Sequence, residues 1–177
     1  VGNVPYVTDS LLMTGDGSDN LRFLPVGLDV RGKNCIVVGG GGVGTRKVHT
    51  LVRGGAAVTV VSPTVTEELA AEIEAGRARW IKDSFQESHF GDAFLVIAAT
   101  DDEELNATII QAAAKRGALV CDASSADRSQ VIFGALHTGE DATIAVFTDG
   151  RDPAHARRTR DRIAGFLGAD SPPEDET

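Results

Sequence analysis

Three glycines between residues 39 and 44 are the residues of this chain whose spacing most directly indicates a chemical task. They are spaced Gly39-x-Gly41-x-x-Gly44 and follow the apolar run of residues 35–38. In such a motif the first glycine allows a tight turn, the second lets the backbone approach a phosphate, and the third lets a helix pack closely on a sheet. Unpaired N–H groups at the start of that helix then bind the phosphates. The spacing predicts a dinucleotide site, with a glycine-rich turn that binds no ligand as the alternative.

The type of dinucleotide is indicated by the end of the second expected strand, at Ser62. No acidic residue stands there, about 20 residues after the glycines, to bind the ribose hydroxyls, and no arginine stands there to bind the 2′-phosphate of NADP. We therefore expect NAD, with its adenosine held by backbone groups near Ser62 to Thr64. Thr100 and Asp101 follow the fourth strand on the side where ligands bind, and capping of the next helix is a second, compatible role. The candidate cofactor-binding residues are Gly39, Gly41, Gly42, Val43, Gly44, Ser62, Pro63, Thr64, Thr100 and Asp101.

Strands and helices alternate from residue 34 onward. The apolar pattern predicts strands near 34–38, 57–61, 78–82, 93–98 and 118–122, and helices near 43–53, 66–75 and 102–116. Thr64 and Glu67 have the spacing of a capping box at the second helix. Residues 83–91 are expected to form a loop or short turn. This alternation predicts an α/β fold, a Rossmann-type doubly wound parallel sheet.

The pattern changes after Ser125. Residues 130–136 and 142–148 are expected to form a hairpin, and Pro153 suits the first turn of a helix that runs to about Leu167. A hairpin with one helix is marginally stable alone, so this small α+β unit should pack on the sheet domain or, as we prefer, form a homodimer. The expected division is a flexible N-terminal extension (1–22), an NAD-binding Rossmann domain (23–124), a dimerisation and substrate unit (125–168) and an acidic tail (169–177).

Composition excludes several other classes of function. The net charge of −9 argues against a nucleic-acid partner. No stretch approaches the roughly 18 apolar residues of a membrane span, so we expect no membrane partner and a cytoplasmic location. Cys35 and Cys121 fall in expected strands without metal-ligand spacing, and the four histidines form no pair at helical spacing. We therefore expect two buried thiols and no metal site.

Four motifs follow one another along the chain. They are residues 24–32 before the first strand, 37–47 in the glycine turn, 98–106 after the fourth strand and 148–157 at the start of the last helix. Together they resemble the precorrin-2 dehydrogenase/sirohydrochlorin ferrochelatase family, the dehydrogenase part of sirohaem synthases, from about Leu24 to Leu167. The resemblance implies NAD-dependent oxidation of precorrin-2 to sirohydrochlorin, and in some members the insertion of ferrous iron to make sirohaem.

The tetrapyrrole implied by this resemblance is a polycarboxylate, so an acidic protein must supply cations locally to bind it. Five arginines lie within twelve residues, namely Arg151, Arg157, Arg158, Arg160 and Arg162. Their guanidinium groups suit carboxylates, although an exposed helix face is the alternative for the last three. The family pattern matches Arg46, Lys47 and Arg157, and Thr148 falls where some relatives have a serine. These four are the candidate substrate-binding residues.

The resemblance also places an aspartate, thought to act as an acid or base, just after the fifth strand. Ser124 occupies that position here. A serine hydroxyl needs a partner base for such a role, and Asp122 lies nearby, so Ser124 and Asp122 are the candidate catalytic residues. We expect a dehydrogenase with weak or absent ferrochelatase activity. A bifunctional dehydrogenase/ferrochelatase, a non-catalytic dinucleotide- or tetrapyrrole-binding module, and an unrelated NAD oxidoreductase remain the alternatives.

Overall fold

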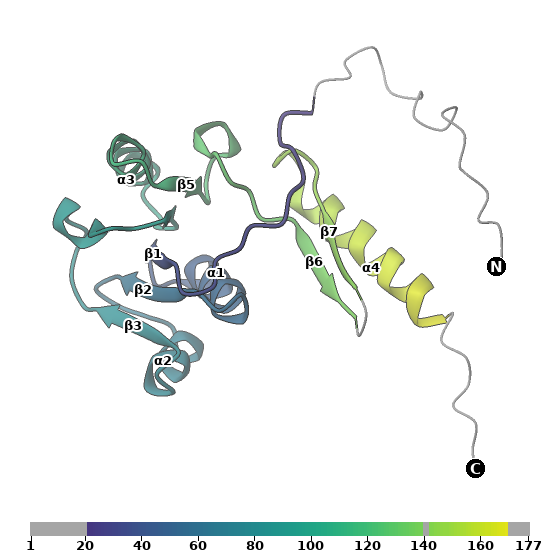
Figure 1. Ribbon diagram of the computed structural model, residues 1–177, viewed down its shortest axis with the longest axis horizontal. Helices are drawn as coiled ribbons and strands as arrows, with labels where there is room; N and C mark the ends of the chain where they lie inside the picture. Colours follow the sequence, from purple (N-terminus) through teal and green to yellow (C-terminus); the bar gives the residue numbers. More distant parts are fainter. Residues whose placement is uncertain (1–20, 140–141, 170–177) are drawn as a thin grey trace.

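The computed structural model describes residues 21–139 and 142–169 of the chain. The expected acidic tail, apart from Ala169, and all but the end of the expected extension lie outside these residues. Figure 1 shows a sheet domain and, beside it, a smaller unit made of a hairpin and a long helix. The sheet domain ends with the strand that closes at Asp122, and the smaller unit begins with the strand that starts at Ala135.

Five parallel strands form the central sheet in the order β3-β2-β1-β4-β5. They are β1 (Asn34–Val38), β2 (Ala57–Val61), β3 (Ala78–Ile81), β4 (Leu95–Ala98) and β5 (Leu119–Asp122). The chain builds outward from β1 to β3 and then returns to place β4 on the other side of β1. In open α/β sheets, ligands bind at the carboxyl ends of the strands at this reversal. The predicted Rossmann-type fold is confirmed.

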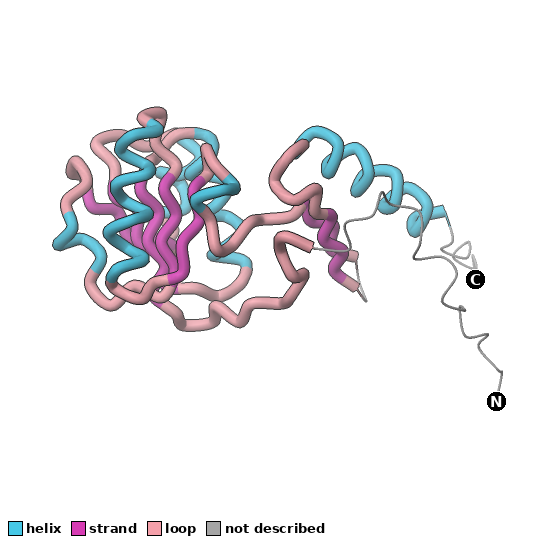
Figure 2. Tube along the Cα trace, turned by 90° about the horizontal axis from the view of Figure 1, so that it is seen from above, coloured by secondary structure: helices cyan, strands magenta, loops and turns pink. Residues whose placement is uncertain are grey.

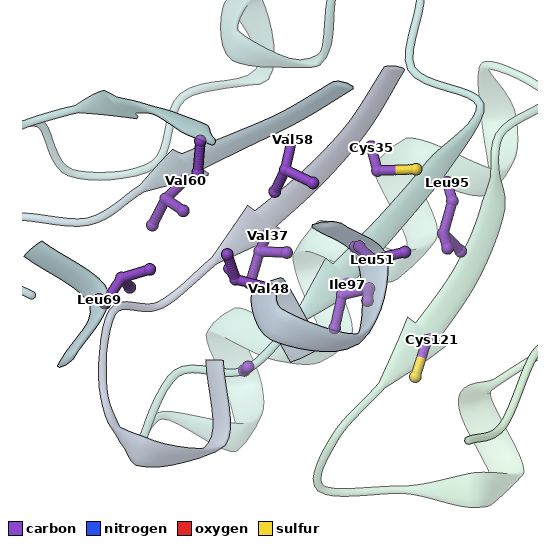
Figure 3. Close-up of a cluster of buried hydrophobic side chains, with 12 residues drawn as sticks. Cys35, Val37, Val48, Leu51, Val58, Val60, Leu69, Leu95, Ile97 and Cys121 are labelled. Carbon is purple, nitrogen blue, oxygen red and sulfur yellow. The ribbon is translucent and has the colours of Figure 1, made fainter. Parts of the chain in front are cut away.

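Helices cover both faces of the sheet. The helices α1 (Gly42–Arg53) and α2 (Glu67–Glu74) lie on one face, and α3 (Glu103–Lys115) lies on the other with the 3₁₀ turn η2 (Glu87–Phe90). Figure 3 shows Val48 and Leu51 of α1 over Val37 of β1 and Ile97 of β4. Because both faces are buried, the central strands are apolar at consecutive positions rather than at alternate ones.

The start of α2 differs from the prediction. The capping box of Thr64 and Glu67 is wrong, because the N-cap is Thr66, whose side chain accepts a hydrogen bond from Leu69 N–H at 3.1 Å. The N–H of Thr66 donates to the carbonyl of Gly40 at 3.1 Å. This contact ties the residues before α2 to the glycine turn, and the helix therefore begins only at Glu67.

The smaller unit contains β6 (Ala135–Thr138), β7 (Thr143–Val146) and α4 (Pro153–Ala169), which packs on both strands. The first of these strands begins later than predicted. The N–H groups of Gln130 and Val131 both donate to the carbonyl of Val120, so residues 130–134 approach β5 without forming a ladder. Figure 2 shows the hairpin and α4 set apart from the sheet domain.

The contact between α1 and the end of β1 generates a stability prediction. A Cβ atom on Gly44 would lie 2.1 Å from the carbonyl oxygen of Gly39. Helix propensity favours alanine over glycine by about 0.5 to 1 kcal/mol, but this overlap should dominate. We expect Gly44→Ala to lower the free energy of unfolding by about 2 kcal/mol in urea denaturation.

Gly42→Ala is the matched control, because a Cβ at Gly42 in the same helix meets nothing within 4 Å. It should unfold at the same urea concentration as the unaltered protein or at a higher one. Equal stability of the two variants would contradict the tight packing inferred at Gly44.

Candidate functional site

The glycine turn lies between β1 and α1, at the carboxyl edge of the sheet. Gly39 has a φ of +112°, and a Cβ there would lie 2.3 Å from the carbonyl oxygen of Ala99. Gly44 is equally confined, whereas a Cβ on Gly41 would meet nothing within 4 Å. Packing thus requires glycine at the first and third positions, while the middle position faces open space.

This turn fits the pyrophosphate of a dinucleotide. Gly41 is the N-cap of α1 and brings no side chain to the helix start, and the first turn contains no acidic residue. The N–H groups of Gly42 and Val43 precede the first intrahelical bond, which Thr45 N–H donates to Gly41. Such N–H groups and the helix dipole favour a bound anion.

Residues after β2 divide into one that holds the turn and two that face solvent. Ser62 is buried, its hydroxyl accepts the N–H of Gly40 at 3.1 Å, and its carbonyl accepts the indole N–H of Trp80 at 2.9 Å. Pro63 and Thr64 are exposed. Among the three predicted adenosine contacts, Ser62 is therefore occupied in supporting the turn, and Pro63 and Thr64 are the accessible pair.

A buried asparagine connects the ends of β4 and β5. Asn106 of α3 is 0% exposed, and its side-chain oxygen accepts the N–H and the hydroxyl of Thr100 at 3.1 and 2.7 Å. Its Nδ2 donates to the carbonyl of Thr100 at 3.0 Å and to the hydroxyl of Ser124 at 3.3 Å. Two predicted site residues that follow different strands are thus brought together by one that the sequence analysis did not select. The available signal was a polar side chain among the apolar positions of α3.

The capping role considered for Thr100 and Asp101 is wrong. The N-cap of α3 is Asp102, whose carboxylate accepts the N–H groups of Glu104 and Leu105 at 2.9 and 3.0 Å. Thr100 is directed to Asn106 instead, and Asp101 is exposed at the carboxyl edge of the sheet. A cofactor-binding role for both residues stays a prediction.

Ser124 and Asp122 form a hydrogen-bonded pair with an arginine. The Ser124 hydroxyl donates to Oδ1 of Asp122 at 2.6 Å, and Arg128 donates through Nε to Oδ2 at 2.6 Å. Burial raises the pKa of Asp122, but hydrogen bonds from Ser124 and Arg128 outweigh it, and the pKa lies below its ordinary value. Arg128 belongs to the 3₁₀ turn η3 (Ala126–Arg128) and was not among the predicted residues. The pair has the arrangement in which a carboxylate can take a proton through a hydroxyl.

The predicted substrate-binding residues lie in two separate places, on α1 and in the smaller unit. Arg46 and Lys47 lie on α1, where the Lys47 ammonium is 4.0 Å from the ring centre of Phe133 and burial lowers the pKa of Lys47. Arg157 is exposed on α4, on the other side of the hairpin (Figure 1). The Thr148 hydroxyl donates to the carbonyl of Asp152 at 2.9 Å and so closes the turn before α4.

Comparison with known proteins relates this geometry to a family. The profile of a family described as "Putative NAD(P)-binding" matches residues 26–135, which include the glycine turn, Asn106 and Arg128. The chain belongs to this family. Membership confirms the expectation of a nicotinamide dinucleotide as the cofactor.

Individual relatives of the chain are siroheme synthases and a precorrin-2 dehydrogenase. The chain is 38% identical to Siroheme synthase 1 of Pectobacterium atrosepticum over 84% of its own length and 31% of that protein, and 36% identical to Siroheme synthase of Nitrosospira multiformis over 83% and 32%. It thus spans about a third of the length of these curated relatives. Among solved structures, "SirC, precorrin-2 dehydrogenase" has a TM-score of 0.72 at 28% identity, covering 81% of this chain and 71% of that one. The resemblance indicated by the four motifs is confirmed.

Two further findings concern residues 21–139 and 142–169 alone. In this part of the chain no group of three or more histidine, cysteine, aspartate or glutamate side chains is placed to hold a metal ion. Nor does any helix there combine the length and apolar character that crossing a membrane requires.

Open space at Gly41 generates a binding prediction. A valine at this position should leave the fold intact, because no neighbouring atom is displaced, but its side chain would occupy the approach of the phosphates. We expect Gly41→Val to abolish measurable NAD binding in isothermal titration calorimetry while the thermal unfolding midpoint changes little. Normal NAD affinity in this variant would contradict the placement of the pyrophosphate. Gly27→Ala, where a Cβ also meets nothing within 4 Å and which lies before β1 rather than in the turn, is the control and should change neither quantity.

Proposed function

We propose that this protein oxidises precorrin-2 to sirohydrochlorin with NAD as the cofactor, in sirohaem biosynthesis. The observation that carries the proposal is the hydrogen-bonded pair of Ser124 and Asp122 at the carboxyl edge of a sheet whose switch point holds the glycine turn. The siroheme synthases and the precorrin-2 dehydrogenase to which the chain is similar support the same reaction.

The oxidation removes a hydride and a proton from the substrate. Bound NAD supplies the hydride acceptor, held by the glycine turn, Pro63, Thr64 and residues at the end of β4. Ser124 accepts the proton as its own hydroxyl proton passes to Oδ1 of Asp122. This pathway uses the 2.6 Å hydrogen bond already present between the two side chains.

Cationic side chains bind the carboxylates of the tetrapyrrole. Arg46 and Lys47 on α1 serve this role near the cofactor, and Arg157 and the turn closed by Thr148 serve it on the smaller unit. A local supply of positive charge is needed because the chain as a whole has a net charge of −9. Arginine suits it because its planar guanidinium binds a carboxylate through two parallel hydrogen bonds.

Ferrochelatase activity is weak or absent in this proposal. Iron insertion releases two pyrrole protons, whereas the Ser124–Asp122 pair offers one carboxylate that accepts a proton through one hydroxyl. A non-catalytic module that binds dinucleotide or tetrapyrrole is the second candidate. It is favoured by the ion pair with Arg128, which leaves the buried Asp122 carboxylate inaccessible to a ligand in this structure.

The smaller unit forms a homodimer in this proposal, and the protein works in the cytoplasm. Phe166 is 70% exposed near the end of α4, Leu167 beside it and Leu136 of β6 are also exposed, and the unit stands apart from the sheet domain (Figure 2). A hairpin and one helix bury little apolar surface of their own. A second copy would cover these side chains.

The reaction can be tested anaerobically with precorrin-2 and NAD, by following NADH formation and the absorbance of sirohydrochlorin before ferrous iron is added. We expect stoichiometric NADH and sirohydrochlorin, less activity with NADP, and no acceleration of iron insertion. Ser124→Ala should lower kcat by about 100-fold without changing NAD affinity.

Other outcomes identify the alternatives. Acceleration of iron insertion would show a bifunctional enzyme. NAD binding without turnover of precorrin-2 would contradict the proposed reaction and favour the non-catalytic module.

The dimer can be tested by analytical ultracentrifugation. We expect a sedimenting species of twice the mass of the chain, and we expect Phe166→Asp to convert it to a monomer because a buried carboxylate would lack a partner. Ala71→Asp, on the exposed side of α2, is the control and should leave the dimer intact. A monomer before any substitution would exclude this assembly.

A further inference from the structure

Asp122 is a buried carboxylate whose side chain, within the described chain, forms hydrogen bonds only with Ser124 and Arg128. Its side chain is 0% exposed, whereas that of Arg128 is 36% exposed. Oδ1 accepts the N–H and the hydroxyl of Ser124 at 2.9 and 2.6 Å, and Oδ2 accepts Nε of Arg128 at 2.6 Å. Access of a proton to Asp122 therefore depends on Ser124, and its charge is balanced by Arg128.

Arg128 also donates a hydrogen bond to the Ser124 hydroxyl and so takes up one of its two acceptor positions. Its Nη2 donates to the Ser124 hydroxyl at 3.2 Å, and Asn106 donates to the same oxygen at 3.3 Å. The hydroxyl thus donates once and accepts twice, which is all that a serine oxygen can do. While Arg128 stays in place, Ser124 has no lone pair left to accept a proton from a substrate.

On its outer side Arg128 borders a hollow of about 540 Å³. Thr108, Gln111 and Gln130 contribute polar side chains to the same hollow. Within the described part of the chain, Nη1 of Arg128 donates to no acceptor, since its hydrogen bonds there use Nε and Nη2. The guanidinium is therefore placed between a buried carboxylate and a space that an anionic group can enter.

The backbone of this turn is held independently of Arg128. Arg22 donates to the carbonyl of Ala126 at 3.1 Å and pairs with Asp127. The hydroxyl of Ser129 accepts Asp122 N–H at 2.8 Å and donates to the carbonyl of Ser125 at 2.9 Å. Only the side chain of Arg128 has to move for the guanidinium to leave Asp122.

We propose that Arg128 is a receptor for a substrate carboxylate, and that binding of this carboxylate draws Arg128 away from Asp122 and opens the Ser124–Asp122 pair as the proton acceptor. The inference rests on the proposed oxidation of a polycarboxylate. In the step that it adds, a substrate proton moves to the Ser124 oxygen while the Ser124 hydroxyl proton moves to Oδ1 of Asp122. The bond between the substrate atom and this proton breaks, and its electron pair stays in the substrate to form the new double bond as the hydride passes to the NAD of the proposed reaction.

The energetics favour such a coupling. With Arg128 in place, hydrogen bonds outweigh burial and the pKa of Asp122 is lowered, so the carboxylate is a weak base. Once Arg128 leaves, only the hydrogen bonds from Ser124 still oppose the effect of burial on Asp122. The pKa of Asp122 then rises toward the pH at which the enzyme works. The other charged or titratable groups nearby are Cys121 on the same strand, Lys47 beside Cys121, and Asp127 of η3 with its partner Arg22 from the segment before β1. None of them forms a hydrogen bond with the Asp122 carboxylate.

The pH dependence of the two kinetic constants tests the proposal directly. The profile of kcat/KM reports the free enzyme, and that of kcat reports the substrate complex. In Arg128→Ala we expect the acidic limb of kcat/KM to move to higher pH, while the acidic limb of kcat stays where it is in the unaltered enzyme. If Arg128 instead remained on Asp122 during turnover, both limbs would move together, and this result would overturn the proposal.

A binding measurement separates this proposal from the proposed reaction. We expect Arg128→Ala and Arg128→Gln to weaken sirohydrochlorin binding by about tenfold, as expected for one lost charge-assisted contact, with NAD affinity unchanged. Arg79→Ala is the matched control, because Arg79 is exposed on β3 at the opposite edge of the sheet. Unchanged sirohydrochlorin affinity in both folded Arg128 variants would exclude a receptor role.

Titration of the Asp122 carboxyl by carbon-13 NMR, assigned by its loss in Asp122→Asn, needs no turnover. Sirohydrochlorin should raise the pKa of Asp122 in the unaltered protein, whereas an unchanged pKa would contradict the withdrawal of Arg128. Failure of the proposed reaction would appear separately, as absence of NADH from precorrin-2 in a protein that still shows this shift.

Discussion

Where β1, α1 and β4 meet, backbone lies against backbone without room for a single Cβ atom. Gly44 contacts the carbonyl of Gly39, and Gly39 contacts the carbonyl of Ala99 at the end of β4. These contacts set the distance between the phosphate-binding turn and the next strand of the sheet. They therefore also set where Thr100, Asn106 and Ser124 lie relative to the cofactor, so the cofactor turn and the polar network are positioned by one packing constraint.

The two buried members of the polar network, Asn106 and Asp122, are fully paired. Asn106 uses its oxygen and both N–H groups, and the Asp122 carboxylate accepts three hydrogen bonds. An unpaired polar group at such a site would cost about 1 to 3 kcal/mol, which disfavours alternative positions of these side chains. Arg128 differs from Asn106 and Asp122 in being partly exposed and in bordering an open hollow. The mobile element that the site requires is thus restricted to one side chain.

The sequence was sufficient to predict the sheet, the helices and the glycine turn because these follow from local periodicity and from steric requirements of single residues. It was not sufficient where distant backbone groups decide the outcome. Thr66 starts α2 because its N–H reaches Gly40, and β6 starts late because Gln130 and Val131 converge on Val120. Asn106 and Arg128 were missed for a related reason, since their importance lies in partners that the linear order does not reveal. The roles of Arg46, Lys47, Thr148 and Arg157 toward the substrate stay predictions.

Ser62 has a consequence for how this domain can evolve. Its side chain and backbone are engaged in supporting the glycine turn, so the exposed Pro63 and Thr64 are the accessible residues among the predicted adenosine contacts. Support of the turn by Ser62 and the predicted contacts with the adenosine thus lie at different positions. Substitutions that change the preference between NAD and NADP can therefore accumulate at Pro63 and Thr64 without destabilising the glycine turn. Coenzyme preference is thus a property that this fold can change at little cost in stability.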